Sequence, residues 1–293
     1  MSEAGTAATD LAPLAIICGG GSLPYAVADA IIGRGRKVAL FPIRGWADPV
    51  AVERYPHHWV SLGRFGRFRR LAHAQGCHDV VLIGSLVRPS LRQIKLDWPT
   101  LRLLPRIVRA FRGGDDHLLS NIAAIFADAG LRLVGAHDVA PEILAPHGPM
   151  GVCRPSASDR ADIDCGLAVL SALAPFDIGQ AAVVVQGRVL AVEAAEGTDL
   201  MLARVAELRR RGHLPVATGA GVLVKAPKRD QDRRFDLPTI GPATVEHAAR
   251  AGLAGIAVIA GATLVAELGA AAAAADRTDL FLIGVSERAP GPG

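Results

Sequence analysis

The stretch Leu14-Ala-Ile-Ile-Cys18-Gly19-Gly20-Gly21-Ser22-Leu23-Pro24 joins a short apolar run to three consecutive glycines. A helical pattern of apolar residues follows, from Val27 to Ile32, and ends at Gly33. A strand, a glycine loop and a helix in this order present backbone N–H groups to a phosphate or a carboxylate. The stretch therefore predicts the start of an α/β sheet, with the glycine loop at its ligand-binding edge.

The glycine loop lacks the spacing GxGxxG, which is the fingerprint of dinucleotide binding. An NAD(P)-dependent oxidoreductase is therefore one alternative for this loop. A tight turn that is needed only for packing is another. The loop alone does not decide between these two interpretations.

Strands and helices continue to alternate up to about residue 134, which predicts a doubly wound, Rossmann-like parallel sheet. The expected strands are 38–42, 79–84 and 131–134, and the expected helices are 65–74, 98–111 and 117–129. The strand 79–84 leads into Gly84-Ser85 and Arg88, which we expect at the same sheet edge as the Gly19 loop. Asp115 and Asp116 precede the last of these helices, where a capping role is the simplest interpretation.

Residues 138–160 contain four prolines and two glycines, and this composition predicts a linker. We therefore expect an N-terminal Rossmann-like domain at 13–137 and a C-terminal domain at 161–287. In the second domain, two apolar runs at 182–193 turn at Gln186-Gly187 and predict an antiparallel hairpin. Because strands and helices alternate again beyond it, we expect a mixed-sheet α/β fold there.

Composition narrows the function classes. The chain of 293 residues is 51% hydrophobic with a formal net charge of +4, which is typical of a globular protein and gives no indication of nucleic-acid binding. The four cysteines have no metal-type spacing, which favours buried thiols in a reducing compartment. No secretory signal is apparent, and glycines and Glu267 interrupt the apolar run 259–275. We expect a cytoplasmic protein with at most peripheral contact with a membrane.

The segments Lys225-Ala-Pro-Lys228 and Arg233-Arg-Phe-Asp236-Leu-Pro-Thr239-Ile-Gly241 carry cations and one carboxylate. The prolines prevent regular hydrogen bonding, so loops present these groups. Cations beside a carboxylate suit a phosphate ester with a divalent metal. The alternative is a solvated basic loop in which Asp236 caps a helix or a turn. Further loop acids at Glu193, Glu196 and Asp199 add oxygen ligands of the kind that magnesium prefers.

Nine short motifs resemble, in the same order, those of one known family. They are Gly19-Gly-Gly-Ser-Leu-Pro24, Gly84-Ser-Leu-Val-Arg-Pro89, Gly114-Asp-Asp116, Ala161-Asp-Ile-Asp164, Asp177-Ile-Gly-Gln180, Glu196-Gly-Thr-Asp199, Lys225-Ala-Pro-Lys228, Asp236-Leu-Pro-Thr-Ile-Gly241 and Ala251-Gly-Leu-Ala-Gly255. The family is the UDP-2,3-diacylglucosamine pyrophosphatase of the lipid A pathway, of the type unrelated to the calcineurin-like hydrolase. The resemblance runs from about Leu14 to Val285.

This resemblance implies two α/β domains with the substrate held between them. It implies magnesium-dependent (Mg2+) hydrolysis of the diphosphate to UMP and 2,3-diacylglucosamine 1-phosphate, in which water attacks the sugar-side phosphorus. Asp236 is the implied catalytic residue, and Asp236, Asp199 and Glu196 are the expected metal ligands. The expected substrate-binding residues are Gly19, Gly20, Gly21, Ser22, Gly84, Ser85, Arg88, Asp116, Gln180, Thr198, Lys225, Lys228 and Thr239.

The expected partners are the lipid nucleotide substrate and, transiently, the surface of the inner membrane. Whether the protein forms a homodimer stays open. A module that binds nucleotide sugars or acylated lipids without catalysis is the alternative from another class of function. That alternative requires Asp236 to be dispensable, because there is no turnover for it to support.

Overall fold

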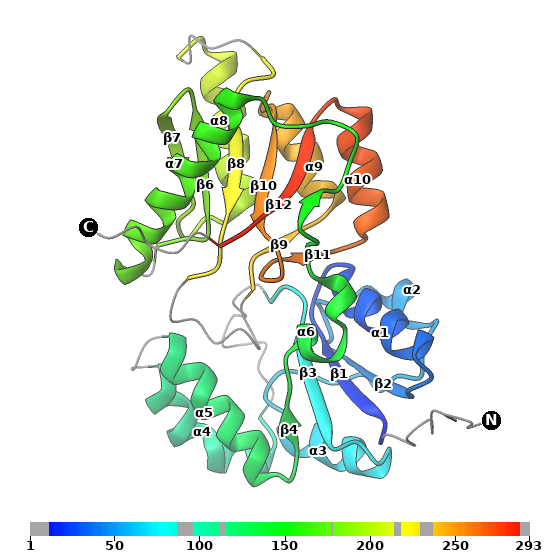
Figure 1. The fold of residues 1–293 in the computed structure, drawn as a ribbon. Coiled ribbons are helices and arrows are strands. Elements are labelled where there is room, and N and C mark those ends of the chain that lie inside the picture. The colour runs from blue at the N-terminus through cyan, green and yellow to red at the C-terminus, as the bar shows by residue number, and fades with distance from the viewer. Residues whose placement is uncertain are drawn as a thin grey trace, which may run out of the picture. The chain divides into compact units, whose positions relative to one another are not determined.

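A computed structural model describes residues 12–86, 96–111, 115–176, 178–213, 218–228 and 237–287 of the chain. The chain forms two compact units, Met1–Pro141 and Glu142–Gly293. Each unit is a layered α/β structure, so the predicted fold class is confirmed (Figure 1). In the part of the chain that is described, no helix has both the length and the apolar character needed to span a bilayer.

The first unit contains a four-stranded sheet in the order β2-β1-β3-β4, in which every neighbouring pair is parallel. Its strands are β1 (Leu14–Cys18), β2 (Val38–Pro42), β3 (Asp79–Ile83) and β4 (Arg132–Leu133). Buried apolar residues fill β1 and β2, as expected for parallel strands that are covered on both faces. Asp79, at the start of β3, accepts hydrogen bonds from Arg36 and Arg132 and so ties the amino ends of three strands together.

The helices of this unit are α1 (Leu23–Gly33), α2 (Pro49–Val52), α3 (Phe65–Ala74), α4 (Trp98–Phe111), α5 (Asp115–Asp128) and α6 (Ala136–Val139). The side chains of residue 104 and residues 106–120 lie outside the described part. Phe68 of α3 packs edge-on against Phe41 of β2, with the ring centroids 4.9 Å apart. Phe65 and Phe68 both contact Phe126 of α5, so an aromatic cluster holds α3 and α5 beside the sheet.

The second unit contains a mixed six-stranded sheet in the order β5-β12-β10-β8-β6-β7. Its strands are β5 (Gly148–Pro149), β6 (Ala181–Val185), β7 (Arg188–Val192), β8 (Val222–Lys225), β10 (Gly255–Ile259) and β12 (Phe281–Val285). The three central strands β8, β10 and β12 are parallel, whereas β6 runs antiparallel to both β8 and β7. The predicted hairpin with its turn at Gln186-Gly187 is confirmed, and Asp162 accepts both backbone N–H groups of that turn.

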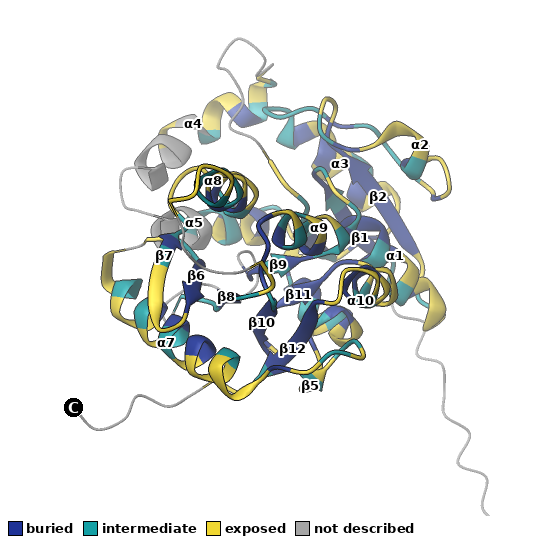
Figure 2. Ribbon diagram, turned by 90° about the horizontal axis from the view of Figure 1, so that it is seen from above, coloured by how far each residue is buried: buried dark blue, intermediate teal, exposed yellow. Residues whose placement is uncertain are grey.

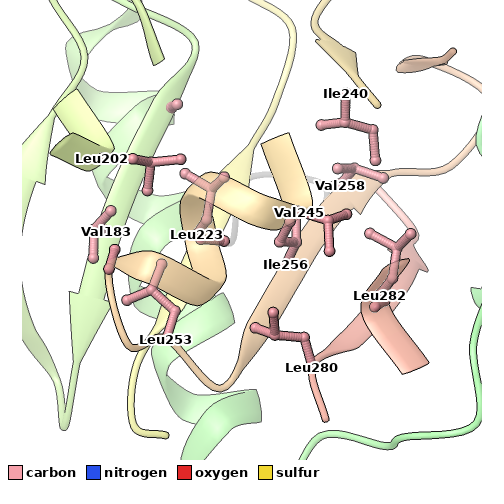
Figure 3. Close-up of a cluster of buried hydrophobic side chains, with 14 of the residues drawn as sticks. Val183, Leu202, Leu223, Ile240, Val245, Leu253, Ile256, Val258, Leu280 and Leu282 are labelled. Atoms are coloured by element: carbon pink, nitrogen blue, oxygen red, sulfur yellow. The ribbon is translucent and has the colours of Figure 1, made fainter. Parts of the chain in front are cut away.

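Helices cover both faces of this sheet. They are α7 (Ala157–Leu173) on one face and α8 (Thr198–Arg210), α9 (Pro242–Arg250) and α10 (Leu268–Arg277) on the other, as Figure 2 shows. Side chains alternate along β8, so Val222 and Val224 face α7 while Leu223 joins the core under α8 and α9. Figure 3 shows Leu223 in this larger core with Leu202 of α8 and Val245 of α9.

A short parallel pair, β9 (Thr239–Ile240) with β11 (Leu264–Val265), lies outside the six-stranded sheet. In the chain, β9 directly precedes α9 and β11 directly precedes α10. The two strands contribute Ile240 and Val265 to the larger core. The pair therefore fixes the backbone directly before the N-terminus of α9.

The segment 138–160, which we expected as a linker, carries regular structure. A 3-10 turn spans Pro141–Ile143, and β5 pairs antiparallel with β12. The helix α7 begins at Ala157, because the Ser156 side chain accepts the backbone N–H of Asp159 and the Asp159 carboxylate accepts the backbone N–H of Ser156. The division between the two compact units falls at residues 141 and 142, inside the expected segment.

Candidate functional site

The glycine loop of the first unit lies against the loop that follows β3. The backbones of Gly20 and Ser85 exchange two hydrogen bonds, of 2.8 and 2.9 Å. A Cβ atom on Gly19 would lie 2.6 Å from the carbonyl oxygen of Ser85, and one on Gly84, where φ is +102°, would lie 2.8 Å from that of Gly20. The glycines at 19 and 84 are therefore required because the two loops touch through their backbones.

The sheet edge in the first unit thus brings together six of the expected binding residues: Gly19, Gly20, Gly21, Ser22, Gly84 and Ser85. Ser22 occupies the N-cap position of α1 without a capping hydrogen bond from its side chain. Burial raises the pKa of the neighbouring Cys18 thiol to about 12, and a backbone hydrogen bond lowers it less. Because this thiol stays protonated at physiological pH, it offers no thiolate chemistry at the loop.

Two other expected residues of this unit are not placed at that edge. Arg88 lies outside the described residues. Asp116 belongs to α5, so it is the second residue of the helix and not its N-cap, and its side chain lies outside the described part.

The second unit has a cavity of about 260 Å³ at the carboxyl end of β8. It is lined by Glu196, Gly197, Thr198, Asp199, Lys225, Thr239 and Thr244. Ligands of open α/β sheets bind beyond the carboxyl ends of parallel strands, and this is such a position. Expected site residues from three separate motifs are therefore neighbours in the fold, namely Glu196, Thr198 and Asp199 from the first, Lys225 from the second and Thr239 from the third.

Lys225 is the cation of this cavity, and strand alternation explains its position. As the last residue of β8, it follows Leu223 on the face that α8 and α9 cover. The residue is only 5% exposed, and its Nζ donates to Thr198 Oγ1 at 2.8 Å and to the carbonyl oxygen of Thr239 at 3.0 Å. Thr198 and Thr239 thus fix the ammonium at the cavity wall, where a positive charge attracts an anion.

The N-terminus of α8 adds to the positive potential at this cavity. Gly197 is the N-cap of α8, and Thr198 is its first helical residue. The hydroxyl of Thr198 donates to Glu193 Oε1 at 2.7 Å. The first turn of α8 lines the cavity, and Gly197 has no side chain to accept its backbone N–H groups, so these groups favour an anion there.

The two carboxylates of the cavity wall each contact a cationic or polar partner. Glu196 Oε1 lies 3.0 Å from Arg204 Nη2, and Asp199 Oδ1 lies 2.9 Å from His247 Nδ1. Both acids are partly solvent-accessible, with 30% and 65% of their side-chain surfaces exposed. Their oxygen donors match the preference of magnesium, which is bound through one or two carboxylates together with substrate phosphates.

No group of three or more histidine, cysteine or acidic side chains among the described residues could hold a metal by itself. Asp236, the third expected ligand and the expected catalytic residue, lies outside the described residues. Lys228 is described, in the loop after β8, but it does not line the cavity that the described residues form. The donor chemistry of Glu196 and Asp199 fits magnesium as part of a shared protein and phosphate shell.

Gln180, one of the expected substrate-binding residues, donates its backbone N–H to Glu193 Oε2 at 2.9 Å. Three residues at this site were not in the predicted binding set. Thr244 lines the cavity and accepts the N–H of Gly241, His247 pairs with Asp199, and Glu193 contacts Thr198. Thr244 and His247 lie on α9 with ordinary helical spacing, so the sequence offers no signal for them.

Both units of the chain are similar to known proteins. Residues 13–143 match the LpxI N-terminal domain and residues 146–283 match the LpxI C-terminal domain. The chain is also 44% identical, over 272 residues, to the UDP-2,3-diacylglucosamine pyrophosphatase LpxI of Caulobacter vibrioides, with 93% of this chain and 97% of that protein covered. Because both domain models and a full-length relative agree, the chain belongs to the LpxI family of pyrophosphatases.

Proposed function

We propose that the protein hydrolyses the diphosphate of UDP-2,3-diacylglucosamine to UMP and 2,3-diacylglucosamine 1-phosphate in lipid A biosynthesis, with magnesium as cofactor. As a member of the LpxI family it is a pyrophosphate hydrolase, in agreement with the resemblance in its motifs. The observation that carries the substrate assignment is the buried Lys225 beside the N-terminus of α8, in a chain 44% identical to a protein named for this substrate.

The chemistry of the cavity suits a diphosphate diester, which is a dianion. Lys225 and the first N–H groups of α8 would bind non-bridging oxygens and stabilise the charge that develops on phosphorus. Thr198 and Thr239 hold the ammonium in place from two sides, so little reorganisation is needed when the substrate enters.

In this proposal, water attacks the sugar-side phosphorus, the bond from that phosphorus to the bridging oxygen breaks, and the oxygen leaves with UMP. Asp236 is the proposed catalytic residue, and it stands three residues before Thr239, whose carbonyl oxygen accepts from Lys225. Glu196, Asp199 and Asp236 would supply carboxylate oxygens to magnesium. The ion, when bound, would add charge stabilisation on the phosphate oxygens.

The test is incubation of the purified protein with UDP-2,3-diacylglucosamine in ¹⁸O-labelled water, with magnesium or with EDTA, beside Asp236→Asn. We expect UMP only with magnesium and intact Asp236, and the label only in the acylated sugar phosphate. Label in UMP would overturn the site of attack. A protein that binds the lipid nucleotide without releasing UMP would be the non-catalytic binding module.

We also propose that the protein acts in the cytoplasm and contacts the inner-membrane surface, where its acylated substrate resides. Support comes from α4, whose sequence has three arginines and no acid. Trp98 on this helix is 65% exposed, Leu101 is 44% exposed, and the Arg102 guanidinium lies 5.3 Å from the centre of the Trp98 ring. An exposed tryptophan beside arginines suits the interface of an anionic bilayer.

Co-sedimentation with phosphatidylglycerol-containing vesicles tests this contact. Trp98→Ala should weaken binding several-fold, whereas Phe176→Ala, a change at a similarly exposed aromatic of the second unit, should not. Equal binding by both variants and by the original protein would contradict a role for α4.

A further inference from the structure

Glu193 follows β7 and uses both oxygens of its carboxylate. Oε1 accepts the hydroxyl proton of Thr198 at 2.7 Å, and Oε2 accepts the backbone N–H of Gln180 at 2.9 Å. Glu193 does not line the cavity that the described residues form, and it lies one hydrogen bond behind the cavity wall.

The direction of these hydrogen bonds follows from what each group is able to do. An ammonium only donates, an ionised carboxylate only accepts, and a hydroxyl has a single proton. Because Thr198 gives its proton to Glu193, the lone pairs of Thr198 Oγ1 are left for Lys225 Nζ, 2.8 Å away. The two hydrogen bonds therefore have a single direction, from Lys225 to Thr198 and from Thr198 to Glu193.

The backbone fixes Glu193 independently of its side chain. Its N–H donates to the carbonyl oxygen of Ala181 at 2.8 Å. Gly179, at a φ of +47°, lies so close that an added Cβ would collide with the carbonyl oxygen of Glu193. The segment 179–181 therefore holds Glu193 at both its backbone and its carboxylate, and the position of the carboxylate is set before any ligand arrives.

We propose that Glu193 is a positioning residue, which acts through Thr198 to hold the ammonium of Lys225 where the cavity receives a phosphate group. The predicted effect on turnover rests on the proposed function, whereas the predicted effect on anion binding does not. Without the carboxylate, the hydroxyl of Thr198 is free to rotate its proton toward Lys225, and the ammonium loses Thr198 Oγ1 as a fixed acceptor.

Glu193→Gln keeps the shape of the side chain but replaces one acceptor by an NH₂ donor, so Thr198 and Gln180 compete for the single remaining oxygen. Loss of a positioned charge-assisted hydrogen bond predicts a fall in kcat/KM of roughly tenfold to hundredfold. Thr198→Val should cause a similar fall, whereas Thr198→Ser, which keeps the hydroxyl, should retain several-fold more activity than Thr198→Val. Glu207→Gln is the matched control, because Glu207 lies on the exposed part of α8 and pairs with Arg210.

A double-mutant cycle separates positioning from a general structural role. If Glu193 acts through the hydroxyl, Glu193→Gln should cause no further loss in a protein that already carries Thr198→Val. A double variant whose fold-loss equals the product of the two single fold-losses would overturn the proposal. If Glu193→Gln does not fold, the comparison of Thr198→Ser with Thr198→Val carries the test, and equal activity of these two variants overturns it.

Calorimetric binding of inorganic pyrophosphate provides a second readout that needs no turnover. The same non-additive pattern is expected in the dissociation constant for pyrophosphate. If it is found while the original protein releases no UMP, the positioning role stands and the proposed function fails. If the original protein releases UMP but Glu193→Gln binds and reacts like Glu207→Gln, the proposed function stands and the positioning role fails.

Discussion

Replacement of Lys225 by methionine removes the positive charge that this side chain brings to the cavity, while it preserves most of the volume of the side chain. A charge-assisted hydrogen bond is worth about 1.5–3 kcal/mol, so loss of one such bond to a phosphate predicts a fall in kcat/KM of roughly tenfold to 150-fold. The side chain is only 5% exposed, which places this interaction away from solvent screening.

The effect on stability should be smaller, because two contributions oppose each other. Loss of the ammonium leaves Thr198 Oγ1 and the carbonyl oxygen of Thr239 without a donor, at about 1–3 kcal/mol for each acceptor that stays unsatisfied. The methionine also removes the desolvation penalty of a buried cation, which is several kcal/mol. We therefore expect a free energy of unfolding within about 2 kcal/mol of the original value.

The assay is UMP release over a range of substrate concentrations, with urea denaturation of the same samples. Lys37→Met, at an exposed lysine of the first unit, controls for the loss of one positive charge from the whole protein. A folded Lys225→Met protein with kcat/KM within twofold of the original value would refute the assignment of Lys225 as the phosphate-binding cation.

Three further predictions concern stability. Burial works to raise the pKa of the Asp79 carboxyl, but hydrogen bonds from Arg132 and Arg36 outweigh it and lower the pKa. Its stabilisation is therefore fully present above the unfolded pKa of about 3.9 and is lost as pH falls through the lower folded value, so Asp79→Asn should lower the urea midpoint at pH 7 by more than it does at pH 2. Gly84→Ala should destabilise the first unit by about 2 kcal/mol or more, because φ is +102° and the added Cβ meets Gly20, and hydrogen exchange at β1 would reveal it. Asp162→Ala removes the acceptor of two turn N–H groups at a residue that is 2% exposed, which should cost about 1–3 kcal/mol in urea denaturation, and an unchanged midpoint would contradict it.

Local patterns in the sequence were sufficient to predict the sheets and the domain class. The apolar runs that became β1, β2 and β8 are bounded by glycine, proline or charged residues, so their limits could be read within a residue or two. The short β5 could not be predicted, because Gly148 and Pro149 carry no strand propensity and owe their pairing to β12. The start of α7, by contrast, has a local signal in the capping box of Ser156 and Asp159.

The site was predicted only in part, because some of its contacts join residues that no local sequence pattern connects. Thr198, Lys225 and Thr239 were identified from motifs, and their proximity follows from the fold. Glu193 was seen only as a loop acid, because its role depends on a hydroxyl five residues later and on a backbone N–H thirteen residues earlier. Such contacts are set by the path of the chain, and single-sequence patterns do not encode them.

The pairing of β5 with β12 has a consequence for synthesis of the protein. The first strand of the second unit bonds to the last, so β12 is an interior strand between β5 and β10. Translation must therefore run through Val285 and release that segment from the ribosome before this sheet is complete, whereas the sheet of the first unit is complete by Leu133. Because its opening and closing strands are neighbours, the second unit is also suited to circular permutation, with new ends cut in an exposed loop and the old ones joined.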